Sequence, residues 1–363
     1  MRDMWWGMVD SWEQFRERVD TWVLGEKHGL YGAAACRIGT ALSVVGLLLA
    51  NLSTRDLWVG QASIWAEPAR AVSQFPELAV LHNVSSDVLT VVYVVTMLAA
   101  VALVLGWHTK AANVITFVGF IAIVAQNPVV GGQSDNLVRL TLLWLLLMRT
   151  SERWSLDARR RTKAREARRP QRAWDEDVLP RWLSTAVHNL ALVGLATQTV
   201  LVYMAAGLDK VSQHAWQHGT ALYYTMQLPE YRPFPWLSDL LSSSTFVLAV
   251  VTYTVMLVQL FFAPLLLNPI SRRVLLVLAV GVNIIFAFLF AAPWSSLAVI
   301  SVTCLFVSTH TWEAVDDRVR DVFAPATEWV SDRGGAVLDV GDELRHRFIL
   351  PVYDWVRYTI FRR

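Results

Sequence analysis

Apolar residues are gathered into long blocks that short polar segments separate. Most blocks approach the roughly 20 residues that an α-helix needs to cross the hydrocarbon core of a bilayer. They do not alternate apolar and polar positions, as the strands of a membrane β-barrel would. The pattern therefore predicts an all-α integral membrane protein with about eight transmembrane helices in one membrane domain. The predicted spans are residues 30–52, 87–105, 111–126, 137–148, 182–207, 245–267, 274–292 and 294–308. The fourth block is short, so we expect its helix to begin before Arg139.

The two ends of the chain differ from these blocks. Residues 1–29 carry tryptophan, phenylalanine and valine at helical spacing, with charged residues between them. This pattern predicts an amphipathic helix that lies on the membrane surface, and we expect it not to be a cleavable signal peptide. Residues 310–363 form a polar tail with no further span, which we expect to be helical and cytoplasmic.

Charge indicates the orientation. Charged residues make up 17% of the chain, whereas a soluble protein carries about a quarter. Basic residues are concentrated in one polar loop, 153–180, and such loops lie in the cytoplasm. Counting spans from it places both termini in the cytoplasm and the loop 208–244 outside. We therefore expect a multi-pass protein of the plasma (inner) membrane, in which the basic loop serves topology or contact with anionic lipid, not nucleic acid.

The strongest candidate for chemistry is the stretch that follows the fifth span. Asp209, Lys210, His214 and His218 arrive within ten residues of each other. Ionisable groups at the membrane edge are costly, and they usually pair or line a cavity. A lysine that is half out of water can act as a base. The alternative interpretation is that Asp209 and Lys210 are interfacial residues that extend to water.

Three further charged residues, Arg37, Asp135 and Arg139, lie within or beside predicted spans. All but Arg37 are near an outer end, so we expect a polar pocket there. We also expect Asp209 or Asp135 to lie within a few ångströms of Lys210 or Arg139, because an unpaired charge at that depth would be expensive.

The remaining polar residues do not indicate a metal or disulfide. His214 and His218 are one helical turn apart, but the glutamate and third ligand of a helical zinc site do not follow, so we expect no metal. Cys36 and Cys304 both fall inside apolar blocks and indicate no disulfide framework. Asn283 lies within a span, where such residues are more often partners in interhelical hydrogen bonds than ligands.

Several stretches, in their order and spacing, resemble one known family. The first is Tyr203-x-x-Ala-Gly207-x-x-Lys210 with Trp216-x-x-Gly219. The others are Arg37-Ile-Gly39, Leu105-Gly-Trp-His-Thr-Lys110, and the block from Gly131-Gly132 through Arg139 to Trp154-Ser-Leu-Asp157. Over residues 30–309 the chain resembles the horizontally transferred transmembrane (HTTM) family. This family includes the vitamin K-dependent γ-glutamyl carboxylase and the sporulation-delaying protein B type.

The resemblance implies a function at the outer face. Lys210 matches the carboxylase lysine that starts the oxygenation of vitamin K hydroquinone. It implies a reduced quinone (vitamin K or menaquinol-like) as cofactor, with CO2 and O2 as reactants if carboxylation is retained. Membrane lipid and a secreted peptide or small protein are the implied partners. The sequence departs from the carboxylase at Asp209, where that enzyme has another lysine.

On this interpretation the candidate site has two sets of residues. The catalytic candidates are Lys210, His214 and His218. The candidates for lining the quinol pocket are Arg37, Asp135, Arg139, Tyr203, Asp209, Trp216 and Asn283. Two alternatives stay open. One is a sporulation-delaying protein B-like factor that matures a secreted peptide without oxidising quinol, and the other is a non-enzymatic membrane subunit.

Overall fold

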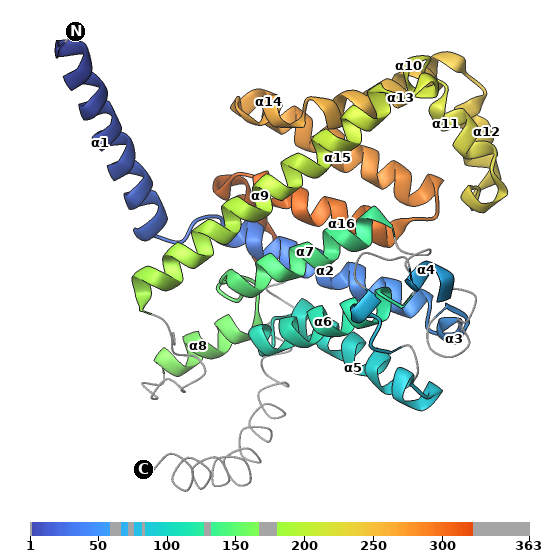
Figure 1. Cartoon of the computed structure of the whole chain (residues 1–363), viewed down its shortest axis with the longest axis horizontal. Coiled ribbons are helices and arrows are strands. Elements are labelled where there is room, and N and C mark those ends of the chain that lie inside the picture. Colours follow the sequence, from blue (N-terminus) through green and yellow to red (C-terminus); the bar gives the residue numbers. More distant parts are fainter. Residues whose placement is uncertain are drawn as a thin grey trace, which may run out of the picture. The chain divides into compact units, whose positions relative to one another are not determined.

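A computed structural model describes residues 2–58, 67–71, 76–81, 84–126, 132–166 and 180–321 of the chain. These residues form helices, turns and irregular segments, with no strand among them (Figure 1). The α-helices are α1 (Arg2–Leu24), α2 (Leu30–Ala50), α3 (Arg55–Trp58), α4 (Glu67–Ala71), α5 (Ser86–Leu105), α6 (Thr109–Val124), α7 (Gln133–Leu147), α8 (Leu156–Glu166), α9 (Arg181–Val211), α10 (His214–Gln217), α11 (Ala221–Gln227), α12 (Pro235–Ser242), α13 (Thr245–Leu260), α14 (Phe262–Leu266), α15 (Pro269–Leu289) and α16 (Pro293–Thr303). Short 3-10 turns are η2 (Pro76–Leu78), η3 (Pro229–Tyr231) and η4 (Cys304–Phe306).

Each predicted span coincides with helix, and the all-α fold is confirmed. The helix of the fourth span, α7, begins at Gln133, before Arg139 as expected. Within the described residues, four helices are long and apolar enough to cross a membrane, or up to six if each of two bent pairs is one span, and α6 is a shorter apolar helix. The chain is therefore a multi-pass membrane protein, while the count of eight spans stays a prediction.

Two segments predicted as loops contain helices. The loop 153–180, predicted to be cytoplasmic, includes α8, and its residues 167–179 lie outside the described part of the chain. The loop 208–244, predicted to lie outside, contains α10, α11 and α12. In addition, α9 continues to Val211, four residues beyond the predicted end of the fifth span, so that Lys210 belongs to a helix.

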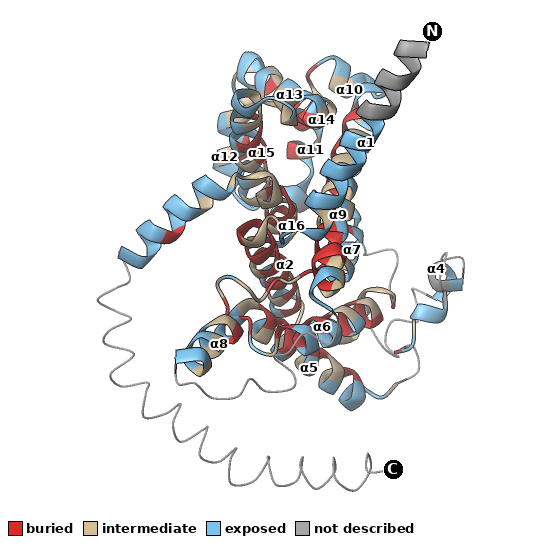
Figure 2. Cartoon of the chain, turned by 90° about the vertical axis from the view of Figure 1, so that its left-hand side faces the viewer, coloured by how far each residue is buried: buried red, intermediate tan, exposed pale blue. Residues whose placement is uncertain are grey.

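The helix at the centre of the core is α2, whose residues are largely buried (Figure 2). It packs against α5, α7 and α16. A side chain at Gly46 would overlap the ring of Trp294, so this glycine lets α16 approach closely. Two hydrogen bonds join the same helices, Thr40 Oγ1 to Ser301 Oγ at 3.0 Å and Ser43 Oγ to the Trp294 carbonyl at 2.6 Å.

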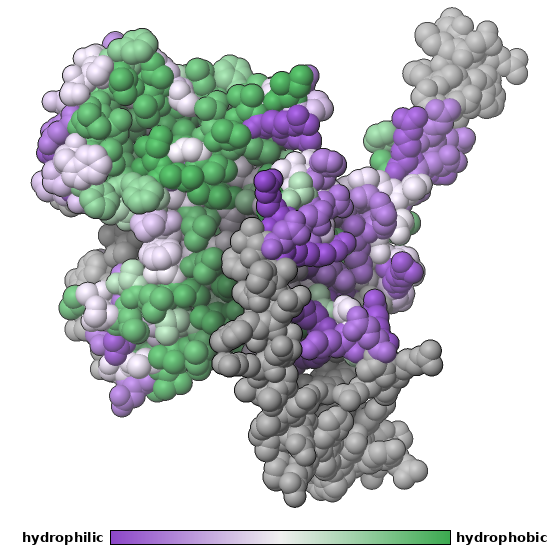
Figure 3. Space-filling view, turned by 180° about the vertical axis from the view of Figure 1, so that it is seen from behind, coloured by the Kyte–Doolittle hydropathy of each residue, from purple (hydrophilic) through white to green (hydrophobic). Residues whose placement is uncertain are grey.

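A second group of helices is built around α9. It packs against α7 and α13, and α15 packs against α13 and α16. A Cβ at Gly207 would lie 2.5 Å from the Leu260 nitrogen, so the backbones of α9 and α13 are nearly in contact. Large apolar side chains such as Leu98 on α5, Leu201 on α9 and Val277 on α15 are exposed. Figure 3 shows broad hydrophobic areas on one face of the protein, which are typical of a lipid-facing surface.

The amphipathic helix α1 ends against α9. The Asn189 side chain donates from Nδ2 to the carbonyls of Trp22, Val23 and Glu26, at 2.7–3.0 Å. Its Oδ1 accepts a hydrogen bond from the backbone nitrogen of His28. These bonds satisfy carbonyls that the end of a helix leaves without partners. The helix is confirmed, and its place on the membrane surface stays a prediction.

The chain divides into two compact units, Met1–Val307 and Ser308–Arg363. In the second unit, residues Thr309–Asp321 are helical, and Arg320 forms an ion pair with Asp316 at 2.6 Å. The rest of the predicted tail, residues 322–363, lies outside the described residues.

Candidate functional site

Lys210 lies in the last turn of α9 and is half-buried. Its Nζ donates to the Ala206 carbonyl at 3.3 Å and lies 5.0 Å from the centroid of the Trp216 ring. Trp216 belongs to α10, which follows α9 after a tight turn held by a bond from the Gln213 nitrogen to the Lys210 carbonyl. The structure therefore brings Lys210 and Trp216 together, as two members of the predicted site.

The neighbouring Asp209 is exposed and points elsewhere. Its Oδ2 accepts a hydrogen bond from Gln213 Nε2 at 2.9 Å. Adjacent side chains on a helix point about 100° apart, which accounts for this separation. Lys210 thus makes no ion pair with Asp209 within 4.0 Å.

The charge pairing expected between the outer ends of the spans is not formed. Asp135 accepts a hydrogen bond from the Gly132 nitrogen at 2.8 Å, and Arg139 donates to Asn136 Oδ1 at 2.5 Å. Both residues are described, and neither forms an ion pair with Asp209, Lys210 or the other. Local backbone and amide groups satisfy these charges, so no long-range pairing is needed.

Tyr203 lies two turns before Lys210 on the same face of α9. Its ring stacks on Phe262 with centroids 4.0 Å apart, and its hydroxyl lies 3.0 Å from Thr303 Oγ1. Asn283 lies beside the same hydroxyl and donates to the Ala279 carbonyl at 2.8 Å. The hydrogen bond of Asn283 is therefore within its own helix, α15, and its interhelical role stays a prediction.

His214 and His218 are exposed at the surface of the same turn. Their rings stack with centroids 5.5 Å apart, and His218 Nδ1 lies 2.8 Å from the His214 carbonyl. No hydrogen bond joins either ring to Lys210, whose Nζ donates to Ala206. In the described ranges, no three histidine, cysteine, aspartate or glutamate side chains come together in a way that could hold a metal ion.

Asp135 lines a narrow recess that belongs to other helices. The recess is formed by α2, α6, α7 and the start of α16, with no residue from α9 or α10. Its lining residues are Ser43, Val44, Leu47, Phe120, Ser134, Asp135, Val138 and Ser295. Ser134 Oγ and Ser295 Oγ lie 3.1 Å apart at its edge. The structure therefore does not unite Asp135 or Arg139 with Lys210.

Arg37 is also separated from Lys210. It is fully buried near the start of α2, where its Nη2 donates to the Trp154 carbonyl at 2.6 Å. Trp154 lies two residues before the start of α8, and Figure 1 shows α8 near the N-terminal end of α9, whereas α10 lies at its C-terminal end. Arg37 therefore does not lie in the predicted quinol pocket. It is bonded in the core at the opposite end of the helices.

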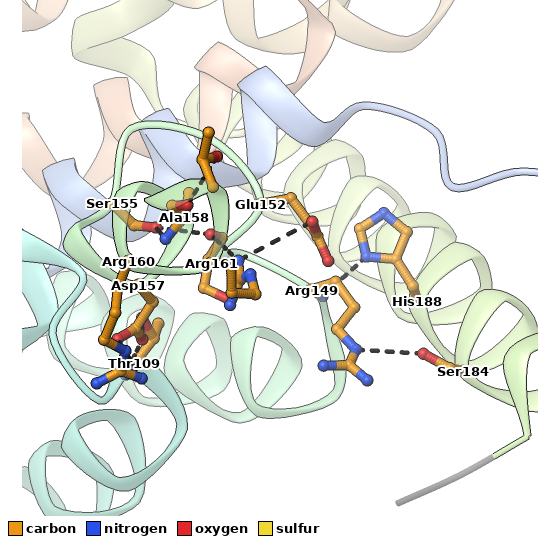
Figure 4. Close-up of polar contacts among 12 residues, drawn as sticks. Thr109, Arg149, Glu152, Ser155, Asp157, Ala158, Arg160, Arg161, Ser184 and His188 are labelled. Carbon is orange, nitrogen blue, oxygen red and sulfur yellow. Dashed lines mark hydrogen bonds and ion pairs between the residues drawn. The ribbon is translucent and has the colours of Figure 1, made fainter. Parts of the chain in front are cut away.

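Asp157, which the sequence analysis did not single out, joins several polar groups at this opposite end of the helices (Figure 4). It is 6% exposed, and its carboxylate accepts three hydrogen bonds. They come from the backbone nitrogens of His108 at 3.1 Å and Thr109 at 2.9 Å, and from Thr109 Oγ1 at 2.8 Å. A carboxylate from α8 therefore caps the N-terminus of α6. The only signal in the sequence is its place at the end of Trp154-Ser-Leu-Asp157.

Gly106 completes this assembly, and three of the resembling stretches meet there. It has a φ of +67°, and a side chain would overlap Arg37 Nη1 and Ser155. Its carbonyl accepts a hydrogen bond from the Asp157 nitrogen at 3.0 Å. We name this group of Arg37, Gly106, Trp154 and Asp157 the Asp157 hub.

The Gly106→Ala variant is expected to lose about 2–4 kcal/mol of unfolding free energy, because alanine is strained at positive φ and its methyl group overlaps packed atoms. The matched control is Gly281→Ala, since nothing lies within 4 Å of a Cβ at that position in α15. Chemical denaturation in detergent measures both. Equal stability of the two variants would contradict the close packing at Gly106.

Basic residues surround a second network beside the hub (Figure 4). The backbone nitrogen of Arg149 donates to His188 Nδ1 at 2.9 Å. Because Nδ1 accepts, the ring is neutral and its proton is on Nε2. Nε2 donates to the His28 carbonyl at 2.8 Å. Lys27 lies nearby in the linker between α1 and α2. Burial lowers the pKa of Lys27, Glu152 raises it, and the positive charges of Arg149, Arg181 and Arg161 lower it further. Positive charge is therefore concentrated at this end of the helices.

One family model, described as HTTM domain, matches residues 34–312. No curated protein and no solved structure matches the chain. The matched range contains the Asp157 hub and the surroundings of Lys210.

Proposed function

Because the chain belongs to the HTTM domain family, we propose that it is a carboxylase-like integral membrane enzyme that uses Lys210 as a base beside a reduced quinone. The observation that carries the proposal is the position of Lys210. It is a half-buried lysine at the end of a span, it faces an aromatic ring, and it has no carboxylate within ion-pairing distance.

The charges around Lys210 suit a base. A lysine must lose its proton before it can accept another, and a paired carboxylate would hold that proton in place. Asp209 is the adjacent carboxylate, and it is bonded to Gln213 instead. The Trp216 ring attracts an ammonium group but cannot accept its proton.

The same surroundings suit an aromatic head group. Trp216 supplies a flat apolar surface beside Nζ, and it packs against a buried cluster of Leu222, Met226, Leu248 and Leu289. A bound hydroquinone would supply the electrons and the acidic hydroxyl, with CO2 and O2 as reactants if carboxylation is retained. Lys210 Nζ would accept the hydroxyl proton, and Trp216 would orient the ring. Tyr203 is assigned to holding α9 against α16, because its hydroxyl lies 3.0 Å from Thr303 Oγ1, and Asn283 to α15, where it is bonded to the Ala279 carbonyl.

We place this site at the outer face of the plasma membrane, with both termini in the cytoplasm. The support is the gathering of Lys27, Arg149, Arg161 and Arg181 near the N-terminal end of α9. Cytoplasmic ends of membrane proteins carry such excess positive charge. Lys210 lies at the opposite end of the same 31-residue helix. A secreted peptide would reach it from outside.

The proposal is tested with purified protein in lipid nanodiscs. A short-chain reduced menaquinone is added, and oxygen uptake is recorded against nanodiscs without protein. We expect uptake that saturates with the hydroquinone. In parallel, lipid extracted from the purified protein is analysed for quinone by mass spectrometry. Absence of both saturable uptake and retained quinone overturns the quinol assignment.

The two alternatives make different predictions in the same experiment. A sporulation-delaying protein B-like factor would bind a secreted peptide without taking up oxygen. A non-enzymatic subunit would show neither property, and Lys210 would serve only as a charge that is stabilised by Trp216.

A further inference from the structure

The short helix α12 has its polarity reversed relative to a helix on the surface of a soluble protein. Trp236 is 66% exposed and Leu240 is 62% exposed, whereas Ser238 is 1% exposed. With about 100° of rotation per residue, Trp236 and Leu240 share one face and Ser238 lies on the opposite one. The helix therefore directs its large apolar side chains away from the protein.

The flanks of α12 agree with this orientation. Asp239, beside the apolar face, forms a 2.6 Å ion pair with Arg232 and is exposed. Leu237 and Leu241 pack against a buried cluster that includes Leu222 and Leu248. The helix has a protein-facing side, an apolar side and a charged edge, which is the arrangement of a helix that lies in a membrane interface.

The helix that follows α12 in the chain, α13, also exposes apolar side chains. The axes of α12 and α13 form an angle of 100°, with only two residues between the helices. The first turn of α13 exposes Phe246, and the same side of that helix exposes Val250 and Leu257. α12 and α13 qualify as a candidate span only as a bent pair, in which α13 is the longer helix with 16 residues. An exposed apolar stripe along that helix is typical of a lipid-facing surface. A helix at such an angle to a span lies along the bilayer surface.

We propose that α12 is an interfacial helix whose Trp236–Leu240 face is inserted into the lipid leaflet at the Lys210 end of the spans. Tryptophan is favoured at this depth, because its ring is apolar and its N–H reaches the headgroups. A second copy of the chain fits the face less well. A stable interface covers roughly 800 Å² on each partner, and one face of an eight-residue helix supplies far less.

This placement defines how the site is reached. Leu237 and Leu241 of α12 pack in the same cluster as Trp216, and Trp216 contacts Lys210. With α12 inserted in the leaflet, Trp216 and Lys210 lie at headgroup depth, where a lipid-soluble molecule arrives sideways from the membrane. The position of α12 does not depend on the chemistry of Lys210.

Spin labels on α12 test the insertion. The variants Trp236→Cys and Leu240→Cys are each labelled with a nitroxide in vesicles of phosphatidylethanolamine and phosphatidylglycerol. The matched control is Asp239→Cys, on the charged edge of the same helix. Labelled unmodified protein gives the background, because Cys36 is buried and Cys304 is half-buried. Collision with oxygen reports lipid, and collision with a water-soluble nickel chelate reports water.

We expect the oxygen-to-nickel collision ratio to be several-fold higher at positions 236 and 240 than at 239. Ratios that are equally low at all three positions would place the helix in water and overturn the proposal. An immobilised label that neither reagent reaches would show that a protein partner covers the face, which also overturns it. Because the readout needs no activity, it stays valid if the quinol assignment fails.

Discussion

The Asp157→Ala variant is expected to lose about 3–5 kcal/mol of unfolding free energy. Asp157 is a buried carboxylate that accepts hydrogen bonds from two backbone N–H groups and one hydroxyl at the start of α6. Alanine leaves these donors without their partner at a buried position. It also removes a negative charge from the positive end of the helix dipole and from the neighbourhood of Arg37 and Arg160.

The measurement is thermal unfolding in detergent, followed with a dye that reacts with thiols as they become exposed. Cys36 is fully buried, so it reports loss of the core. The melting temperature should fall by several degrees. The Asp157→Asn variant should lose an intermediate amount, because its oxygen still accepts while its NH2 group opposes a backbone donor. The control is Asp87→Ala, which removes an exposed aspartate from the first turn of α5. Equal melting temperatures for Asp157→Ala and Asp87→Ala would show that Asp157 does not stabilise the Asp157 hub.

Lys210→Ala is expected to reduce hydroquinone-dependent oxygen uptake by at least about 100-fold, the usual contribution of a general base. Lys210→Arg is expected to be equally impaired, because an arginine side chain stays protonated and cannot accept a proton. Both variants should fold and insert normally, since Nζ bonds only to the carbonyl of the preceding turn and lies over one aromatic ring.

The matched control is Lys163→Ala, an exposed lysine on α8 that lies far from Lys210 in the chain and outside its surroundings. Its oxygen uptake should equal that of the unmodified protein. Full activity in Lys210→Arg would contradict the base and leave Lys210 as a fixed positive charge. Melting curves for all three variants separate a loss of activity from a loss of folding.

Apolar blocks and their lengths were sufficient to predict the helices, because a backbone in lipid must satisfy its hydrogen bonds within each segment. This reasoning located the segments that form α2, α5, α9 and α15, and it placed Lys210 at the end of a span. The end of α9 was underestimated by four residues. The cause is that Asp209 and Lys210 interrupt the apolar pattern, although both are compatible with helical backbone.

Only the tertiary structure decided which polar residues meet. Arg37, Gly106 and Asp157 are far apart in the sequence, and each looked like part of a separate stretch. The packing of α2 against α5, and the return of the chain at Trp154, bring them into contact. Conversely, Asp135 and Lys210 both lie at the same predicted end of their spans, yet Asp135 lines a recess between α2, α6, α7 and α16, whereas Lys210 lies against Trp216 of α10. The length of the apolar blocks predicts which segments cross the membrane, whereas lateral order among the helices depends on close contacts such as those at Gly46 and Gly207.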